Sequence, residues 1–200
     1  MPYTKEHKES TRQKILESAI SLFSVGGFDQ VSIDGLMKHA GLTRGAFYAH
    51  FDSKQDVYSK AIIAGAKGSR FNACKPDGMN EDTWLRELVF TYLSPEHINQ
   101  DFSPCPLAFL VTDIANNESK VKATYARVYK RLNKGIQIKL DGSINDTETE
   151  LATEEDILAA TAMMIGGVAI GRTLEDKAQR SKLLESCRKG AIDLLKINPK

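Results

Sequence analysis

Four side chains within residues 44–54 are suited to binding an anion. Arg44 carries a planar guanidinium that can donate two parallel hydrogen bonds to a phosphate or to the edge of a guanine. Tyr48 and His50 can donate to phosphate oxygens, and Lys54 adds a positive charge. These residue types at this spacing indicate contact with a nucleic acid, if one surface presents them together.

The surrounding residues predict two short helices joined by a glycine turn. Ser32 is a good N-cap for the first helix, which closes at Gly41, and Thr43 can cap the second helix and leave backbone N–H groups free for phosphate. Gly45 and Ala46 keep the leading turn of the second helix slim. This is the build of a helix-turn-helix, whose second helix enters the major groove of DNA. A plain helical bundle with a capped turn would show the same pattern, so both interpretations stay open at this point.

Other helices are expected on both sides of this pair. Apolar residues recur with the helical period from about residue 10 to 25, and Gly26-Gly27 can end that helix. Ser53 and Asp56 have the spacing of a capping box, which opens a helix after the pair. The same periodicity predicts later helices at roughly 81–94, 105–116, 119–141, 154–175 and 178–197. No strand-like alternation competes with them, so the sequence predicts an all-α protein.

The composition is that of a globular chain with little net charge. Of the 200 residues 42% are hydrophobic, and 27 Lys and Arg against 26 Asp and Glu leave a net charge of +1. Residues 1–70 hold 10 basic and 7 acidic residues, a net of +3, whereas the other 130 hold 17 and 19, a net of −2. The basic excess therefore lies in the part that carries Arg44, which fits a region facing a polyanion.

The sequence does not indicate export, membrane insertion or catalysis. Cys74, Cys105 and Cys187 are odd in number and lack CxxC spacing, which fits free thiols in a reducing cytoplasm. The first residues lack the apolar stretch of a signal peptide, and the longest apolar stretch, 157–170, is too short for a membrane helix. The histidines have no zinc-site spacing, and no Walker, GxSxG or GxGxxG motif occurs. We therefore expect a cytoplasmic protein that is not an enzyme and has no metal, cofactor or membrane partner.

The segment Ser32–Val57 resembles the DNA-binding domain of the TetR/AcrR family of transcriptional regulators. Its most specific part is Gly41-Leu-Thr-Arg-Gly-Ala-Phe-Tyr-Ala-His-Phe51 followed by Ser53-Lys54, and the resemblance extends over about residues 10–60. It implies a homodimer that binds a palindromic operator in double-stranded DNA and is released by a small-molecule effector.

The resemblance also implies two domains with different functions. Residues 1–55 would form the helix-turn-helix DNA-binding domain, with three helices, and residues 56–200 a helical bundle for ligand binding and dimerisation. Ala49 and Gly35 depart from the family pattern, which leaves the base preference open and lowers the helix propensity before the turn. The implied DNA contacts are Ser32, Thr43, Arg44, Gly45, Ala46, Tyr48, His50 and Lys54.

Small residues make the helix expected at 154–175 thin enough for close packing. A second copy of the chain could pack there and form a four-helix bundle with the helix at 178–197, or the thin helix could pack inside its own subunit. The sequence weights these two interpretations equally, and the family resemblance favours the dimer. The small residues are Ala159, Ala160, Gly166, Gly167, Ala169 and Gly171.

An apolar pocket between the middle helices is the expected effector site. Its candidate lining residues could equally be core residues, because aromatic and Met side chains at helical spacing usually pack against neighbours. Cys105 also starts a predicted helix, where the dipole favours a thiolate that could sense oxidants or electrophiles, although its default role is structural. The candidates are Trp84, Phe90, Cys105, Phe109, Tyr125, Tyr129 and Met163.

Two other classes of protein compete with a DNA-binding regulator. A helical enzyme or small-molecule carrier would bind no specific DNA and would need paired titratable groups in a pocket, which the sequence does not reveal. An interaction module would use the thin helix to bind a different protein. A homodimer in solution favours the regulator, and a monomer favours the other two.

Overall fold

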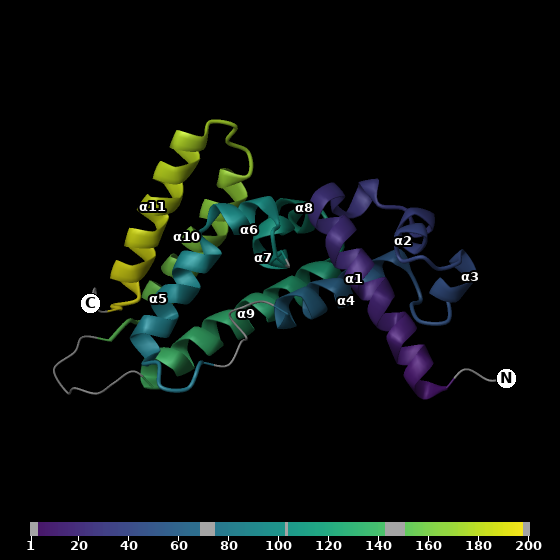
Figure 1. Cartoon of the computed structure of the whole chain (residues 1–200), viewed down its shortest axis with the longest axis horizontal. Coiled ribbons are helices and arrows are strands. Elements are labelled where there is room, and N and C mark those ends of the chain that lie inside the picture. Colours follow the sequence, from purple (N-terminus) through teal and green to yellow (C-terminus); the bar gives the residue numbers. More distant parts are fainter. Residues whose placement is uncertain (1–3, 69–74, 103, 143–150, 198–200) are drawn as a thin grey trace. The chain divides into compact units, whose positions relative to one another are not determined.

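The computed structural model describes residues 4–68, 75–102, 104–142 and 151–197, and every regular element within these ranges is a helix (Figure 1). The predicted all-α class is therefore confirmed. No helix among these residues is both long enough and apolar enough to cross a membrane. The helices are α1 (Lys5–Gln30), α2 (Ile33–His39), α3 (Arg44–Phe47), α4 (Lys54–Lys67), α5 (Glu81–Tyr92), α6 (Pro95–Asn99), α7 (Pro106–Phe109), α8 (Val111–Ala115), α9 (Ser119–Gly142), α10 (Glu154–Gly171) and α11 (Lys177–Leu194).

The helices differ from the prediction mainly between residues 93 and 116. The helix expected at 81–94 ends at Tyr92, because Leu93 leaves helical geometry (φ −91°, ψ 49°) and Ser94 caps a separate short helix that begins with Pro95. The helix expected at 105–116 is broken at Leu110 into α7 and α8. The polar, acidic residues 141–151 between the helices expected at 119–141 and 154–175 predict a loop. Most of this loop, and Cys74, lie outside the described residues.

Contacts divide the chain into two compact units, and the first consists of Met1–Lys67 with Pro104–Val128. Its core is built on α1, which packs against α2 and α4. The buried Tyr58 ring lies edge-on to Phe23 and Phe28, with centroids 4.7 and 5.2 Å away. Full burial of each large apolar side chain contributes roughly 1.5–3 kcal/mol, so this cluster holds α4 firmly against the end of α1.

One carboxylate fixes the C-terminal end of α1. Gly27 leaves helical geometry with φ 67°, within the region where the sequence predicts a helix end, and the next amide, of Phe28, donates to Asp113 Oδ1 at 3.1 Å. The Tyr58 hydroxyl donates to Asp113 Oδ2. Burial, together with the hydrogen bond to Asp113, raises the pKa of Tyr58, so the hydroxyl keeps its proton and remains a donor. Asp113 of α8 thus joins α1 and α4.

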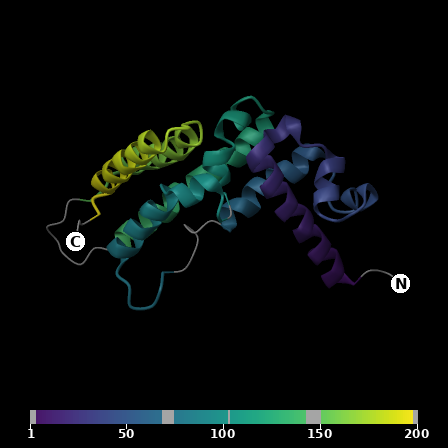
Figure 2. The same cartoon turned by 45° about the horizontal axis from the view of Figure 1, so that its top comes forward.

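The second unit consists of Gly68–Ser103 with Tyr129–Lys200, and α10 and α11 lie antiparallel and side by side in it (Figures 1 and 2). Gly167 and Gly171 allow other side chains to approach α10. A Cβ at Gly167 would lie 2.9 Å from Leu93 Cδ2, and one at Gly171 would lie 2.7 Å from Ile98 Cδ1. These two small residues therefore pack inside their own unit, as one of the two interpretations expects.

Candidate nucleic-acid interface

The turn between α2 and α3 has the geometry of a helix-turn-helix. The Ser32 hydroxyl accepts from the Gly35 amide at 3.0 Å and caps α2, as the sequence predicts. Gly41 has φ 69°, where L side chains are strained, and the next amide, of Leu42, closes the turn on the Met37 carbonyl at 2.9 Å. Thr43 precedes α3 without a side-chain capping hydrogen bond. The glycine therefore permits the tight reversal that places α3 beside α2.

Two buried rings decide which side of α3 faces outward. Phe47 and Phe51 lie four residues apart, are almost fully buried, and have ring centroids 5.7 Å apart. Because these rings face the core, Arg44, Gly45 and Tyr48 are exposed, and Tyr48 retains 57% of its accessible surface. The helical period of the sequence predicts this arrangement, with Ala46, Phe47 and Phe51 inward and Arg44, Gly45 and Tyr48 towards the outside or its edges. The structure agrees for all but Ala46, which is half-buried.

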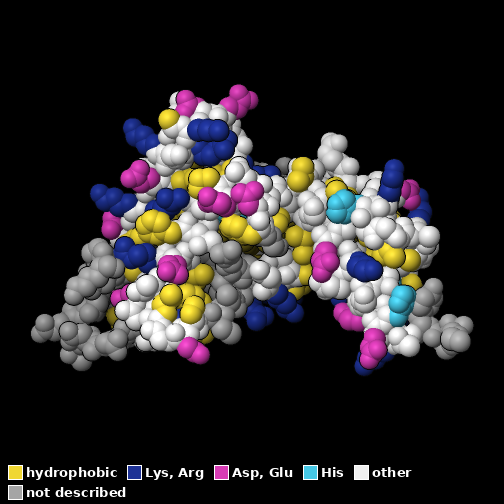
Figure 3. Space-filling view, in the orientation of Figure 1, with side chains coloured by type: hydrophobic (Ala, Val, Ile, Leu, Met, Phe, Trp, Pro, Cys, Tyr) yellow, Lys and Arg dark blue, Asp and Glu magenta, His cyan; other side chains and the backbone are white. Residues whose placement is uncertain are grey.

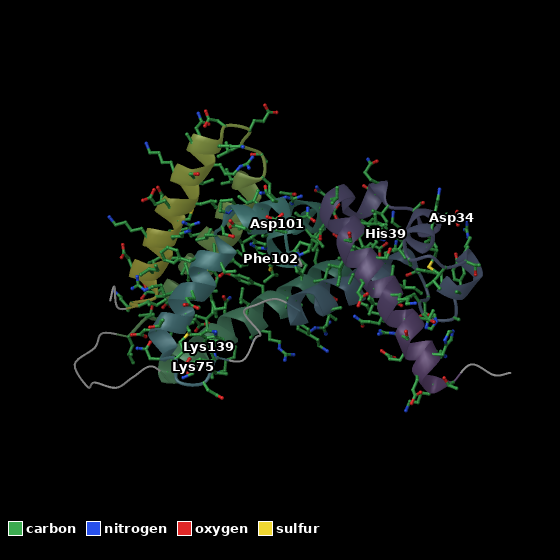
Figure 4. All side chains as sticks on the ribbon, in the orientation of Figure 1. Asp34, His39, Lys75, Asp101, Phe102 and Lys139 are labelled. Atoms are coloured by element: carbon green, nitrogen blue, oxygen red, sulfur yellow. The ribbon has the colours of Figure 1, made fainter. Side chains whose placement is uncertain are left out.

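The outward side of α3 presents an arginine that is already paired. Arg44 Nη1 donates to Asp34 Oδ2 at 2.7 Å, and both side chains are about 60% exposed. Figure 4 labels Asp34 on α2. Hydrogen bonding to Tyr48 and the charge of Asp34 raise the pKa of Arg44, which keeps the guanidinium charged. The sequence motif gave no sign of this pair, because its members lie ten residues apart on two different helices.

His50 and Lys54 are less free than Arg44 and Tyr48. His50 is half-buried, and its Nδ1 has no hydrogen-bond partner among the described residues. Burial first, and then the charges of Lys8 and Arg12, lower the pKa of His50, so the ring is neutral at neutral pH. Lys54 Nζ lies 4.2 Å from the centroid of the Phe28 ring and donates to a backbone carbonyl at 3.5 Å.

The last turn of α2 carries a further polar side chain that the motif did not single out. His39 Nδ1 lies 2.8 Å from the Ser18 hydroxyl, which itself donates to the Leu36 carbonyl at 3.0 Å. This hydroxyl has one proton, so it accepts from His39 Nδ1–H, which leaves the other ring nitrogen facing outward. On the face drawn in Figure 3, basic and acidic side chains are interspersed, so the positive charge there is local rather than continuous.

The seven candidate ligand residues are divided between the two units. Cys105, Phe109 and Tyr125 belong to the first unit, where the two former are buried and the Tyr125 hydroxyl donates to the Leu107 carbonyl at 2.7 Å. Cys105 directly precedes α7, a helix of four residues.

The other four candidates belong to the second unit. Trp84 is buried, Phe90 is exposed, and Met163 Sδ would lie 2.8 Å from a Cβ at Gly190. The Tyr129 hydroxyl lies 3.0 Å from Thr161 Oγ1. These positions include both core residues and surface residues.

Two hollows among the described residues of the second unit differ in chemistry. One, of about 360 Å³, is lined by two lysines and by Asn133, whose buried Oδ1 has no hydrogen-bond partner among the described residues. Lysines and an amide oxygen suit a ligand with an anionic group and a donor. This hollow is lined by Tyr129, Lys130, Asn133, Lys134, Gln137, Glu154, Ile157 and Leu158. The other, of about 420 Å³, combines two carboxylates with two phenyl rings, which suits a cation, and Figure 4 labels two of its residues. It is lined by Phe90, Thr91, Ser94, Glu96, Asp101 and Phe102.

Within the part of the chain that the structure describes, no group of three or more His, Cys, Asp or Glu side chains is placed to hold a metal ion.

Comparison with known sequences places the interface within a matched region. Residues 15–61 match the family described as "Bacterial regulatory proteins, tetR family". The chain is 46% identical over 57 residues to the HTH-type transcriptional regulator AcrR of Shigella flexneri, a match that covers 28% of this chain and only 26% of AcrR. The uncharacterized HTH-type transcriptional regulator YfiR of Bacillus subtilis is 26% identical over an alignment of length 196 that covers 92% of each chain.

Solved structures extend the likeness in fold to nearly the whole chain. The reduced form of Escherichia coli NemR has a TM-score of 0.76 at 13% identity, with 96% of this chain and 100% of NemR covered. A TetR-family transcriptional regulator from Agrobacterium tumefaciens has a TM-score of 0.73 at 18% identity, with 91% and 97% covered. The described helices after residue 61 thus have counterparts in proteins with little sequence similarity.

Proposed function

The chain belongs to the TetR family of bacterial regulatory proteins, and we propose that it is a transcriptional repressor that a small apolar or reactive molecule releases from a palindromic DNA operator. The observation that carries the proposal is the exposed side of α3, where Arg44, Gly45 and Tyr48 project away from two buried rings. No catalytic step, metal or cofactor is needed for this function, which is carried out in the cytoplasm.

In this proposal α3 enters the major groove of double-stranded DNA. Arg44 donates hydrogen bonds to a base edge or a phosphate, and Tyr48 donates a hydrogen bond to a phosphate oxygen. A Cβ at Gly45 would meet nothing within 4 Å, so the helix presents a flat face that can approach the groove closely. Supporting contacts come from Ser32, Thr43, Ala46, His50 and Lys54, as the family resemblance implies.

A second copy of the chain is the proposed partner of the outward side of α10. Leu158 and Ile170 are 39% and 53% exposed, and a Cβ at Gly166 would meet nothing within 4 Å. Ala159 is exposed as well. These residues recur with the helical period and form an apolar surface that suits close packing against a symmetry-related helix. Two-fold symmetry would then pair two α3 helices with the two halves of a palindrome.

The effector is proposed to bind within residues 56–200, while residues 1–55 read DNA. Tyr129 lines one of the hollows, which supports it as a ligand residue. The full set of proposed ligand residues remains Trp84, Phe90, Cys105, Phe109, Tyr125, Tyr129 and Met163. Effector and operator would each favour a different dimer geometry and so weaken the binding of the other.

Fluorescence anisotropy with the full-length protein and a labelled duplex from the region upstream of its gene tests the DNA-binding part. Arg44→Ala should weaken binding by about 5- to 150-fold, since a well-placed arginine contact contributes roughly 1–3 kcal/mol. Tyr48→Ala should weaken it less. Binding should also fall steeply with salt, because phosphate contacts release counterions.

Arg131→Ala is the matched control, because it removes the same charge from an exposed position on α9. The control should bind as tightly as the wild type. Wild-type affinity in Arg44→Ala would contradict the assignment of α3 as the DNA-reading element.

A further inference from the structure

An acidic residue lies where the proposed function calls for positive charge. Asp34 is in the first turn of α2, and its side chain is 62% exposed beside Arg44, the residue proposed to address DNA. A carboxylate at this place repels phosphates, so it lowers the affinity for any DNA, whatever the sequence. Asp34 therefore cannot serve to increase the affinity for DNA, and its role must be a different one.

The geometry of the pair supplies one. Asp34 Oδ2 engages only Nη1 of Arg44, at 2.7 Å, and a guanidinium carries five N–H donors in a rigid plane. Asp34 leaves further N–H donors of the guanidinium that can face the paired acceptors O6 and N7 of a guanine. A guanidinium held at one nitrogen cannot swing freely to a neighbouring phosphate, so the carboxylate restricts which acceptors it reaches.

Tyr48 lies one turn beyond Arg44 on the same exposed side of α3, and hydrogen bonding to Tyr48 first, and then the charge of Asp34, raise the pKa of Arg44. The phenol is itself fixed, because its ring lies edge-on to the buried Phe47 ring with centroids 5.2 Å apart. Arg44 is thus supported by one residue from α2 and one from the end of α3.

We propose that Asp34 is a positioning residue that determines specificity: in the protein–DNA complex it keeps Arg44 directed at one guanine and away from the phosphates. The proposal rests on the proposed function, because it assumes that α3 reads DNA. Its consequence is that Asp34 lowers affinity for DNA in general and raises discrimination between sequences.

Two variants separate the charge of Asp34 from its hydrogen bond. Asp34→Asn removes the charge but keeps an acceptor for Arg44 Nη1, whereas Asp34→Ala removes both. Asp52→Ala, at an exposed acidic position in the same unit, is the matched control for charge. Full-length wild type first selects its preferred duplex from a random-sequence DNA library, and each protein then titrates that duplex, its single guanine substitutions and a scrambled duplex.

Both Asp34 variants should bind the scrambled duplex about two- to fivefold more tightly than wild type, because each removes one negative charge near the phosphates. Asp34→Ala should lose discrimination at one guanine in each half-site, by a large part of the roughly 5- to 150-fold that a bidentate arginine contact supplies. Asp34→Asn should keep most of it, and Asp52→Ala should keep all of it. Partial unfolding would lower both affinities equally and would leave this ratio unchanged.

Wild-type discrimination at every guanine in Asp34→Ala would overturn the proposal while leaving the proposed function intact. Failure of the wild-type protein to enrich any duplex would instead overturn the proposed function and, with it, the role of Asp34.

Discussion

Individual residues near the proposed DNA surface owe their roles to partners on other helices. Arg44 and Tyr48 are exposed because Phe47 and Phe51 are buried. The guanidinium of Arg44 is oriented by the hydrogen bond that it donates to Asp34. The outward and inward residues of this region could be predicted from the sequence, since burial follows the helical period. The ion pair could not, because spacing along the chain does not show which side chains meet across a turn.

His97 predicts how stability depends on pH. It is buried between Tyr92 and Phe102, and its Nδ1 lies 2.6 Å from the Tyr92 carbonyl. Burial first, and to a smaller extent the charge of Arg172, lowers its pKa although the Tyr92 carbonyl acts in the opposite sense. As the pH falls, the His97 ring of the unfolded chain takes up a proton near pH 6.5, whereas the ring in the folded chain does so only at a lower pH. The contribution of the neutral ring to the free energy of unfolding is therefore present above pH 6.5 and is lost as the pH falls below it.

Urea unfolding between pH 7.5 and 5.5 checks this prediction. The free energy of unfolding should fall with a slope of up to about 1.4 kcal/mol per pH unit, and His97→Gln should show a smaller slope than wild type. The partly buried His50 also has a lowered pKa and makes the free energy of unfolding fall with pH in the same direction. The contribution of His97 is therefore the difference in slope between wild type and His97→Gln. Equal slopes in wild type and His97→Gln would contradict the account.

At the scale of elements, the long helices follow from local pattern and the short ones from particular contacts. The period of apolar residues and the Thr153–Asp156 capping box predict α10, and the structure contains both. The attachment of α8 to α1 through Asp113 joins residues that are 85 positions apart in the chain. No local signal marks such a contact, so it could not be predicted from the sequence, and the break at Leu110 that divides the helix expected at 105–116 is not predicted either.

Gly27→Ala tests the attachment of α1. The residue has φ 67°, and an added Cβ would lie 2.9 Å from Asp113 Oδ1, so the variant should lose about 1–3 kcal/mol of unfolding free energy. Gly45→Ala is the control, because Gly45 is helical and a Cβ there meets nothing within 4 Å, and it should be neutral or stabilised by up to about 1 kcal/mol. Equal melting temperatures for Gly27→Ala and wild type would refute the role assigned to this junction.

For the whole molecule, the small residues of α10 fall into two groups. Gly167 and Gly171 pack inside the chain's own second unit, whereas Gly166 and Ala159 are free of such contacts among the described residues. Composition alone could not separate these groups, because the choice depends on where the neighbouring helices lie. The outward group lies on the surface of α10 that is proposed to contact the second copy of the chain. The inward group lets α10 pack closely beside α11.

Light scattering during size exclusion tests that division. Leu158→Glu and Ile170→Glu should convert the proposed dimer to a monomer at micromolar concentration, because each would bury a charge at the interface. Ile138→Glu, at an exposed apolar position on α9, should leave the dimer intact. A dimer that persists in both α10 variants would show that this surface is not the interface.

In the proposed repressor, two copies of α3 read the two halves of one operator. Hydroxyl-radical footprinting of the full-length protein on the duplex selected from a random library tests this arrangement. We expect two protected half-sites of inverted sequence, with centres about 34 Å or a multiple of that apart along the DNA. Uniform weak protection, or no protection at any sequence, would contradict it.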